Sequence, residues 1–174
     1  MFDIMNFFVS FIVMQHTRNK KVTSSLEDYL EAILQLDEDS GRARAVDVAE
    51  KLGVGKPSVT AALKTLSGKG LVDYKPYKPA ALTVEGRRIA RSVRKKHVEL
   101  KSFLAGTLGM EEKQAELEAC RLEHTVSKET IVRLRLLEDY AKNTSRKIKQ
   151  WFSDFRKKAG EYIRQEEIPD EKTK

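Results

Sequence analysis

Residues 45–67, AVDVAEKLGVGKPSVTAALKTLS, have the pattern of two short helices joined by a tight turn. Residues 53–55 form the turn, and Pro57 follows at the first position of the second helix, where a missing N–H leaves no helical hydrogen bond unmade. This spacing predicts a helix–turn–helix. The side chains expected to face its core recur at helical intervals: Val46, Val48, Ala49, Leu52, Val59, Ala62, Leu63 and Leu66.

The flanking segments extend this motif to a winged helix–turn–helix domain over residues 24–90. A helix is predicted to run from a capping serine, Ser24 or Ser25, to about residue 38. Two short strands, residues 71–75 and 81–83, enclose a proline-containing loop and predict a β-hairpin wing. Thr83 is then predicted to cap a long basic helix that ends near residues 106–109.

Residues 91–166 are predicted to form a second, all-helical domain. Helical spacing of apolar residues indicates helices at about 111–122, 127–140 and 144–165. The apolar surface of this part exceeds what one short bundle needs, and we expect a homodimer to use it. The fold class expected for the whole chain is therefore mainly α.

Both ends of the chain stand apart from these domains. Residues 1–23 are an apolar and basic leader, whose first fourteen residues are too few to span a bilayer, which takes roughly 20. No basic region precedes the apolar stretch, so a signal peptide is not expected. An interfacial anchor, a dimer-swapped arm and a true start at Met14 all remain open. Residues 167–174 are expected to be a charged, frayed tail.

The composition favours a polyanionic partner in a reducing compartment. The formal net charge is +7, and the sequence pI is about 9.4. The single cysteine cannot form an internal disulfide, which fits a reducing cytosol. We therefore expect a cytoplasmic protein with no membrane partner.

The second helix of the helix–turn–helix has the side chains of a DNA-reading helix. Small hydroxyl residues and lysines near a helix N-terminus can approach base edges and phosphates, and no acid interrupts them. A lysine-rich helix is often only a solvated face, but the turn and the wing favour double-stranded DNA as the partner. The candidate DNA contacts are Lys56, Pro57, Ser58, Thr60, Ala61 and Lys64 on the helix, with Lys75 and Lys78 on the wing.

The only cysteine lies in a C-x-x-E-H run, Cys120-Arg121-Leu122-Glu123-His124. On a helix, Cys120, Glu123 and His124 project from nearly one face. A thiolate, a carboxylate and an imidazole together suit a first-row divalent metal better than calcium or magnesium. One turn supplies too few ligands, and the further candidates are Asp28, Glu31 and His97.

Taken singly, these residues have ordinary explanations. A lone cysteine is usually a small buried hydrophobe, and a Glu-His pair on a helix is usually a surface pair. Asp28, three residues after Ser25, could be the acidic half of a capping box. Their occurrence together, beside a DNA-reading pattern, favours a metal site.

These residues together resemble the diphtheria toxin repressor and manganese transport regulator family of metal-dependent repressors. The resemblance covers about residues 24–143 and rests on four stretches: SLEDYLE (25–31), KPSVT (56–60), KH (96–97) and EACRLEH (118–124). It implies metal ligands at Asp28, His97, Glu123 and His124, with Cys120 at the position of the cysteine of the iron-responsive branch. It also implies repression of metal-uptake genes through a DNA operator.

The resemblance is mixed between the two branches of that family. Asp28 and Glu31 match the manganese-responsive branch, whereas Cys120 matches the iron-responsive one, so the implied metal is Mn²⁺ or Fe²⁺. Lys101 and Glu116 do not match the ancillary site of the iron-responsive branch, and we expect one metal site per subunit. The chain ends too early for that branch's SH3-like C-terminal domain, which is therefore not expected.

Two other functions compete with this one. A winged-helix regulator of the MarR-like kind explains the wing and the dimer, but leaves the candidate ligands as coincidence. The run C-x-x-E-H also resembles the inverted zinc-peptidase motif H-x-x-E-H with its first histidine replaced. That alternative does not account for the DNA-reading half, so the chain is not expected to be an enzyme.

Overall fold

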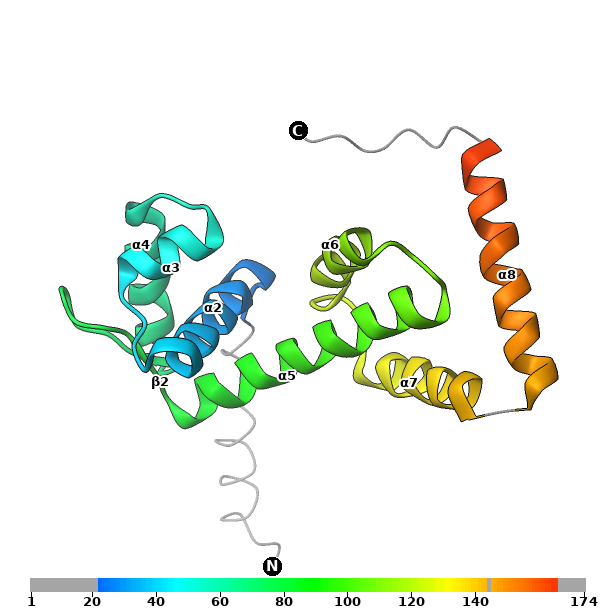
Figure 1. Cartoon of the computed structure of the whole chain (residues 1–174). Coiled ribbons are helices and arrows are strands. Elements are labelled where there is room, and N and C mark those ends of the chain that lie inside the picture. Colours follow the sequence, from blue (N-terminus) through cyan, green and yellow to red (C-terminus); the bar gives the residue numbers. More distant parts are fainter. Residues whose placement is uncertain (1–21, 144, 166–174) are drawn as a thin grey trace, which may run out of the picture. The chain divides into compact units, whose positions relative to one another are not determined.

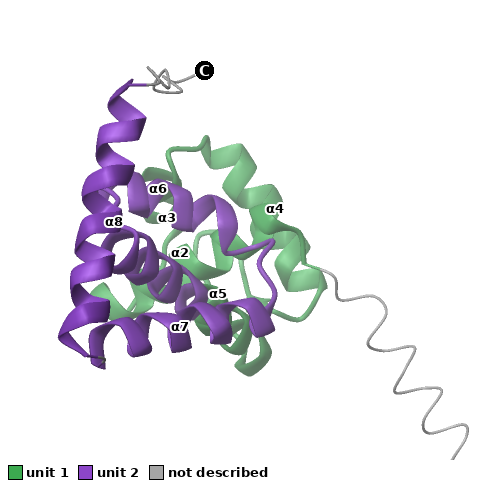
Figure 2. Cartoon of the chain, turned by 90° about the vertical axis from the view of Figure 1, so that its right-hand side faces the viewer, with its two compact units in different colours: residues 1–93 green, residues 94–174 purple. Residues whose placement is uncertain are grey.

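The computed structural model describes residues 22–143 and 145–165, and the chain divides into two compact units, Met1–Val93 and Arg94–Lys174 (Figure 2). The expectations for the leader up to residue 21 and for the charged tail lie outside the described residues. Each unit has a hydrophobic core of its own.

The first unit is a winged helix–turn–helix (Figure 1). Its elements in chain order are the helices α2 (Ser24–Ser40), α3 (Ala45–Leu52) and α4 (Lys56–Gly68), the strands β1 (Val72–Asp73) and β2 (Ala81–Leu82), and the start of the helix α5 (Val84–Ser102). The strands pair antiparallel with Val72 opposite Leu82, and an isolated bridge joins Ala43 to Ala80. The predicted fold class is confirmed, although both strands are shorter than expected.

Packing of α2, α3 and α4 against one another forms the core of this unit. Leu30 and Ile33 of α2 and Leu63 of α4 are fully buried, and each contributes about 1.5–3 kcal/mol relative to an exposed side chain. One core prediction is wrong: Val46 is 42% exposed. Val46 in the first turn of α3 lines a groove, whereas its neighbour Ala45 packs against the core.

The caps of α2 and α5 show how local hydrogen bonding sets the helix ends. The predicted serine cap of α2 is wrong, because Thr23 has the extended backbone of a cap and its hydroxyl accepts from Leu26 N at 3.4 Å. Thr83 caps α5 as predicted: its hydroxyl accepts from Gly86 N at 3.1 Å and donates to Gly70 O at 2.9 Å.

Gly86 lets α5 approach the backbone before β1, and this gives the first prediction. A Cβ atom at residue 86 would lie 2.0 Å from the carbonyl oxygen of Leu71, so the backbone would have to shift. We expect Gly86→Ala to destabilise the fold by roughly 1–3 kcal/mol, as overpacking does. Thermal unfolding followed by circular dichroism measures this. Gly68→Ala is the control, because a Cβ atom there meets nothing within 4 Å, and equal melting temperatures for the two variants would contradict the prediction.

The second unit contains helices only, among the residues described. The C-terminal part of α5 continues into a π-helical turn, η1 (Phe103–Thr107), and the helices α6 (Glu112–Leu122), α7 (Lys128–Asn143) and α8 (Arg146–Gln165) follow. Gly109 lies between η1 and α6 with φ +76°, a conformation that favours glycine. The core is formed by Leu100, Leu104, Ala115, Ala119 and Ile131.

Large apolar side chains remain exposed on α7 and α8. No side chain of the described α8 is buried, and the Trp151 and Phe155 rings stack with centroids 5.8 Å apart. The exposed residues also include Leu136, Leu137, Tyr140, Tyr162 and Ile163. None of the described helices has the length and apolar character needed to cross a bilayer.

Candidate metal centre and nucleic-acid interface

Three of the predicted metal ligands meet in the second unit around one buried carboxylate. The Oε2 atom of Glu123, just after α6, lies 2.8 Å from Nδ1 of His97 on α5. Its Oε1 atom lies 3.2 Å from Nε2 of His124. The side chain of Glu123 is only 1% exposed, so water cannot solvate this carboxylate and both imidazoles approach it directly.

This donor set fits a first-row divalent metal. A buried carboxylate needs a compensating positive charge, because desolvation strongly disfavours the lone anion. Neutral imidazole nitrogens and carboxylate oxygens are ligands of such ions. The nearby ammonium of Lys96 donates to the backbone oxygen of Glu123 at 2.9 Å and so holds the end of α6 beside α5.

The remaining predicted ligands lie on α6 and α2. Cys120 is exposed on α6, one helical turn before His124. Asp28 and Glu31 are half-buried and one turn apart on α2, in the first unit.

The cluster also contains Glu116 and Lys101, which the sequence analysis did not assign to it. Nε2 of His97 lies 3.1 Å from Oε1 of Glu116, and Oε2 of Glu116 lies 2.8 Å from Nζ of Lys101. The hydrogen bond from Lys101 is the largest cause that lowers the pKa of Glu116, and the charge of His97 adds to it. The spacing could have indicated both residues, since Lys101 follows His97 and Cys120 follows Glu116 by one helical turn.

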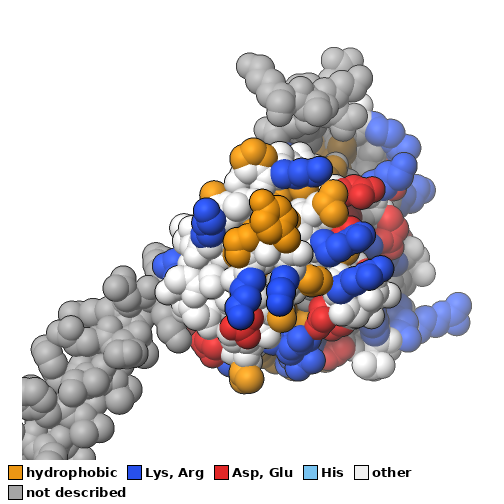
Figure 3. Space-filling model, turned by 90° about the vertical axis from the view of Figure 1, so that its left-hand side faces the viewer, with side chains coloured by type: hydrophobic (Ala, Val, Ile, Leu, Met, Phe, Trp, Pro, Cys, Tyr) orange, Lys and Arg blue, Asp and Glu red, His pale blue; other side chains and the backbone are white. Residues whose placement is uncertain are grey.

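A basic groove of about 570 Å³ lies in the first unit, between the N-terminal ends of α3 and α4 and the wing. Of the described residues that line it, Arg44, Lys56, Lys64 and Lys78 are basic and none is acidic. Figure 3 shows lysine and arginine side chains around hydrophobic ones on the face seen from the left of Figure 1. The groove can therefore attract a polyanion and also pack against apolar groups.

The predicted DNA contacts lie on α4 and the wing. Thr60 is half-buried, and its hydroxyl donates to the backbone oxygen of Lys56 at 3.1 Å. All the others are exposed: Lys56, Pro57, Ser58, Ala61, Lys64, Lys75 and Lys78.

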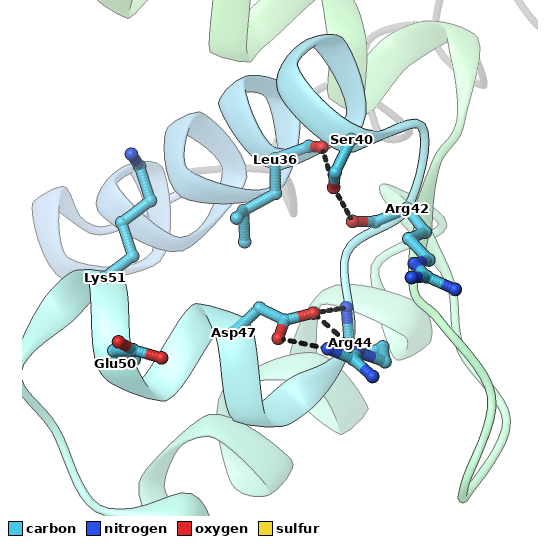
Figure 4. Close-up of a pocket in the computed structure, with 7 residues that line it drawn as sticks. All are labelled: Leu36, Ser40, Arg42, Arg44, Asp47, Glu50 and Lys51. Carbon is cyan, nitrogen blue, oxygen red and sulfur yellow. Dashed lines mark hydrogen bonds and ion pairs between the residues drawn. The ribbon is translucent and has the colours of Figure 1, made fainter.

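Arg44 was not among the predicted contacts, although it lines the groove. The carboxylate of Asp47 accepts from the Arg44 backbone N at 3.3 Å and from its Nε at 2.8 Å, beside a second hollow of about 470 Å³ (Figure 4). The hydrogen bond from Arg44 lowers the pKa of Asp47. Asp47 thus both caps α3 and fixes the guanidinium at the edge of the groove.

Comparison with known proteins agrees with this combination of sites. Residues 21–80 match the family described as iron dependent repressor, N-terminal DNA binding domain, and residues 83–151 match its metal binding and dimerisation domain. The chain belongs to the iron dependent repressor family. The predicted resemblance to the diphtheria toxin repressor and manganese transport regulator family is confirmed. Members are DNA-binding regulators rather than enzymes, so the zinc-peptidase alternative falls away.

Two transcriptional regulators are similar in sequence to most of the region that the family matches. The transcriptional regulator MntR of Escherichia coli O6:H1 is 39% identical over 111 residues, which are 64% of this chain and 71% of that protein. An uncharacterized HTH-type transcriptional regulator of Methanocaldococcus jannaschii is 37% identical over 123 residues, 70% of this chain and 98% of that protein.

Solved structures of manganese regulators share the fold. The manganese regulator SloR is 33% identical with a TM-score of 0.60, over 66% of this chain and 54% of that one. A manganese-dependent transcriptional repressor in complex with manganese is 29% identical with a TM-score of 0.61, over 66% and 53% of the two chains. The match thus spans about half the length of these solved chains.

Proposed function

We propose that this protein is a metal-dependent transcriptional repressor of metal-uptake genes, which binds a double-stranded DNA operator as a homodimer in the cytoplasm. The observation that carries the proposal is the buried Glu123 carboxylate between His97 and His124, in a chain whose other unit is a winged helix–turn–helix. The exposed apolar side chains of α7 and α8, in or next to the matched dimerisation domain, support the dimer.

The metal would be held by residues of both units. We propose Asp28 and Glu31 of α2 as ligands, together with four residues of the second unit: His97, Cys120, Glu123 and His124. A divalent ion supplies the positive charge that carboxylates and a thiolate need when they share one site. Ligands from both units would restrict how the DNA-binding unit is oriented, and would hold the two reading heads of the dimer at the spacing of operator half-sites.

This coupling has a thermodynamic consequence. If metal favours the orientation of the reading heads that binds DNA, the two binding events are coupled, typically by about 1–3 kcal/mol. Metal therefore tightens DNA binding, and DNA tightens metal binding by the same factor.

We propose Mn²⁺ or Fe²⁺ as the metal. The thiolate of Cys120 favours iron, whereas the carboxylates of Asp28, Glu31 and Glu123 favour manganese. The similarity to a manganese regulator and to a manganese-dependent transcriptional repressor of known structure supports Mn²⁺.

One experiment tests the proposal and identifies the metal. The chelator-stripped protein captures fragments of its own genome without metal, with Mn²⁺, with Fe²⁺ under anaerobic conditions and with Zn²⁺, and the bound DNA is sequenced. We expect a few discrete sites with Mn²⁺ or Fe²⁺ and none with chelator. Equal recovery in chelator would instead indicate a winged-helix regulator that senses no metal.

A further inference from the structure

We propose that Glu116, held in place by Lys101, orients His97 for metal binding without being a metal ligand itself. The inference rests on the proposed function, because it concerns the same metal centre. It assigns roles to two residues that lie next to the predicted ligand set, and all the contacts involved lie within the second unit.

The two nitrogens of the His97 ring face different carboxylates. Nδ1 lies 2.8 Å from Glu123, and Nε2 lies 3.1 Å from Glu116. A neutral imidazole carries one proton and one lone pair, and the hydrogen bond at one nitrogen decides which form is present. When Nε2 donates to Glu116, Nδ1 directs its lone pair to the side where Glu123 and His124 meet.

Lys101 fixes the orientation of the Glu116 side chain. The side chain of Glu116 is 51% exposed, and an exposed glutamate otherwise samples many rotamers. Here its two oxygens have separate partners: Oε1 faces His97, and Oε2 receives Lys101 Nζ at 2.8 Å. The Lys101 ammonium also lies 3.6 Å from Glu112. That contact is longer than the one to Glu116, and the side chain of Glu112 is more exposed. The chain Lys101–Glu116–His97–Glu123 thus runs from the surface to the buried carboxylate.

This arrangement argues against Glu116 as a direct ligand of the same ion. The two ring nitrogens of an imidazole point in diverging directions, so a carboxylate at Nε2 lies away from an ion bound at Nδ1. Carboxylates that hydrogen-bond a metal-binding histidine through its other nitrogen fix the ring and raise its basicity. Their loss typically lowers metal affinity by roughly 10–100-fold.

Three variants of the full-length protein separate the possible roles. Mn²⁺ affinity and the number of ions per subunit are measured by competition with a fluorescent chelator. We expect Glu116→Ala to bind Mn²⁺ roughly 10–100-fold more weakly with the number of ions unchanged. Glu116→Gln keeps one oxygen acceptor but turns an N–H group toward one of the two donors, His97 or Lys101, so we expect an affinity between those of the parent and of Glu116→Ala. Glu118→Ala is the matched control on α6, since Glu118 pairs with Arg121 outside the cluster, and it should bind as the parent does.

A spectroscopic measurement reports the orientation itself. In the Zn²⁺-loaded protein with ¹⁵N-labelled histidine, the His97 ring should carry its proton on Nε2 in the parent and in Glu116→Gln. In Glu116→Ala, that proton should exchange faster with water. The ring signal is assigned by its absence in His97→Gln.

The outcomes are distinct for the inference and for the proposed function. Parent-like affinity of Glu116→Ala, or a proton on Nδ1 in the loaded parent, would overturn the orienting role. A Glu116→Gln variant as weak as Glu116→Ala, with fewer ions per subunit, would make Glu116 a ligand instead. If the parent itself binds neither Mn²⁺ nor Zn²⁺, the proposed function fails before the variants are compared.

Discussion

Glu123→Gln should abolish stabilisation of the protein by metal while leaving the metal-free fold at least as stable. The substitution keeps the shape of a side chain that is 1% exposed, but removes the charge that both histidines face. A substitution that removes one partner of a buried ion pair usually destabilises the fold, because the other charge stays buried without compensation. Here the buried charge is the group removed, and the remaining imidazoles can be neutral. The carboxylate at this position therefore serves binding rather than stability.

The size of the metal-induced stabilisation follows from the linkage between metal binding and folding. An ion present at 100 times its dissociation constant stabilises the native state by about 2.7 kcal/mol, which raises the melting temperature by several degrees. We expect this rise with Mn²⁺ in the parent and none in Glu123→Gln. The loss of a central ligand should exceed the roughly 10–100-fold effect of an outer residue.

A second buried carboxylate in the same unit serves as the control. Glu138 on α7 accepts from Ser102 Oγ and from Lys142 Nζ, both at 2.6 Å. Glu138→Gln should lower the melting temperature without metal and keep the full rise with Mn²⁺. If Glu123→Gln shows the same metal-induced rise as the parent, the buried carboxylate is not part of the metal site.

The winged helix–turn–helix could be predicted from the sequence because its signals are local. Pro57 at the start of α4, the glycine turn before it and the helical spacing of apolar residues each depend on a few neighbouring residues. Local signals failed where the outcome depended on packing. Val46 follows the core spacing, but in the folded unit it lines the groove and is 42% exposed.

The metal cluster could be predicted only in part. The spacing of Cys120, Glu123 and His124 indicated a shared site. The almost complete burial of Glu123 is a tertiary property, and glutamates are rarely buried. The approach of His97 to Glu116 and Glu123 depends on the π turn of η1 and on Gly109, which return the chain from α5 to α6. The periodicity of the sequence predicted a plain helix through residue 106, so it could not indicate these contacts.

The combined substitution Lys56→Ala, Lys64→Ala and Lys78→Ala should remove most of the DNA affinity without affecting metal binding. These three lysines line one groove with no acid among its described residues. If each makes a charge-assisted hydrogen bond worth roughly 1.5 kcal/mol, their joint loss weakens binding by roughly 10³-fold or more. Each lost phosphate contact also lowers the slope of log affinity against log salt concentration by about 1, so the slope should fall by about 3.

The measurement is fluorescence anisotropy of labelled operator DNA at saturating metal, over a range of KCl concentrations. The control is Lys113→Ala, Lys149→Ala and Lys157→Ala, three exposed lysines of the second unit that give the same change in net charge. If DNA binding depends on the groove, only the first triple variant loses affinity and salt dependence. If both variants lose them equally, attraction follows from the +7 net charge of the chain as a whole, and the groove is not the reading surface.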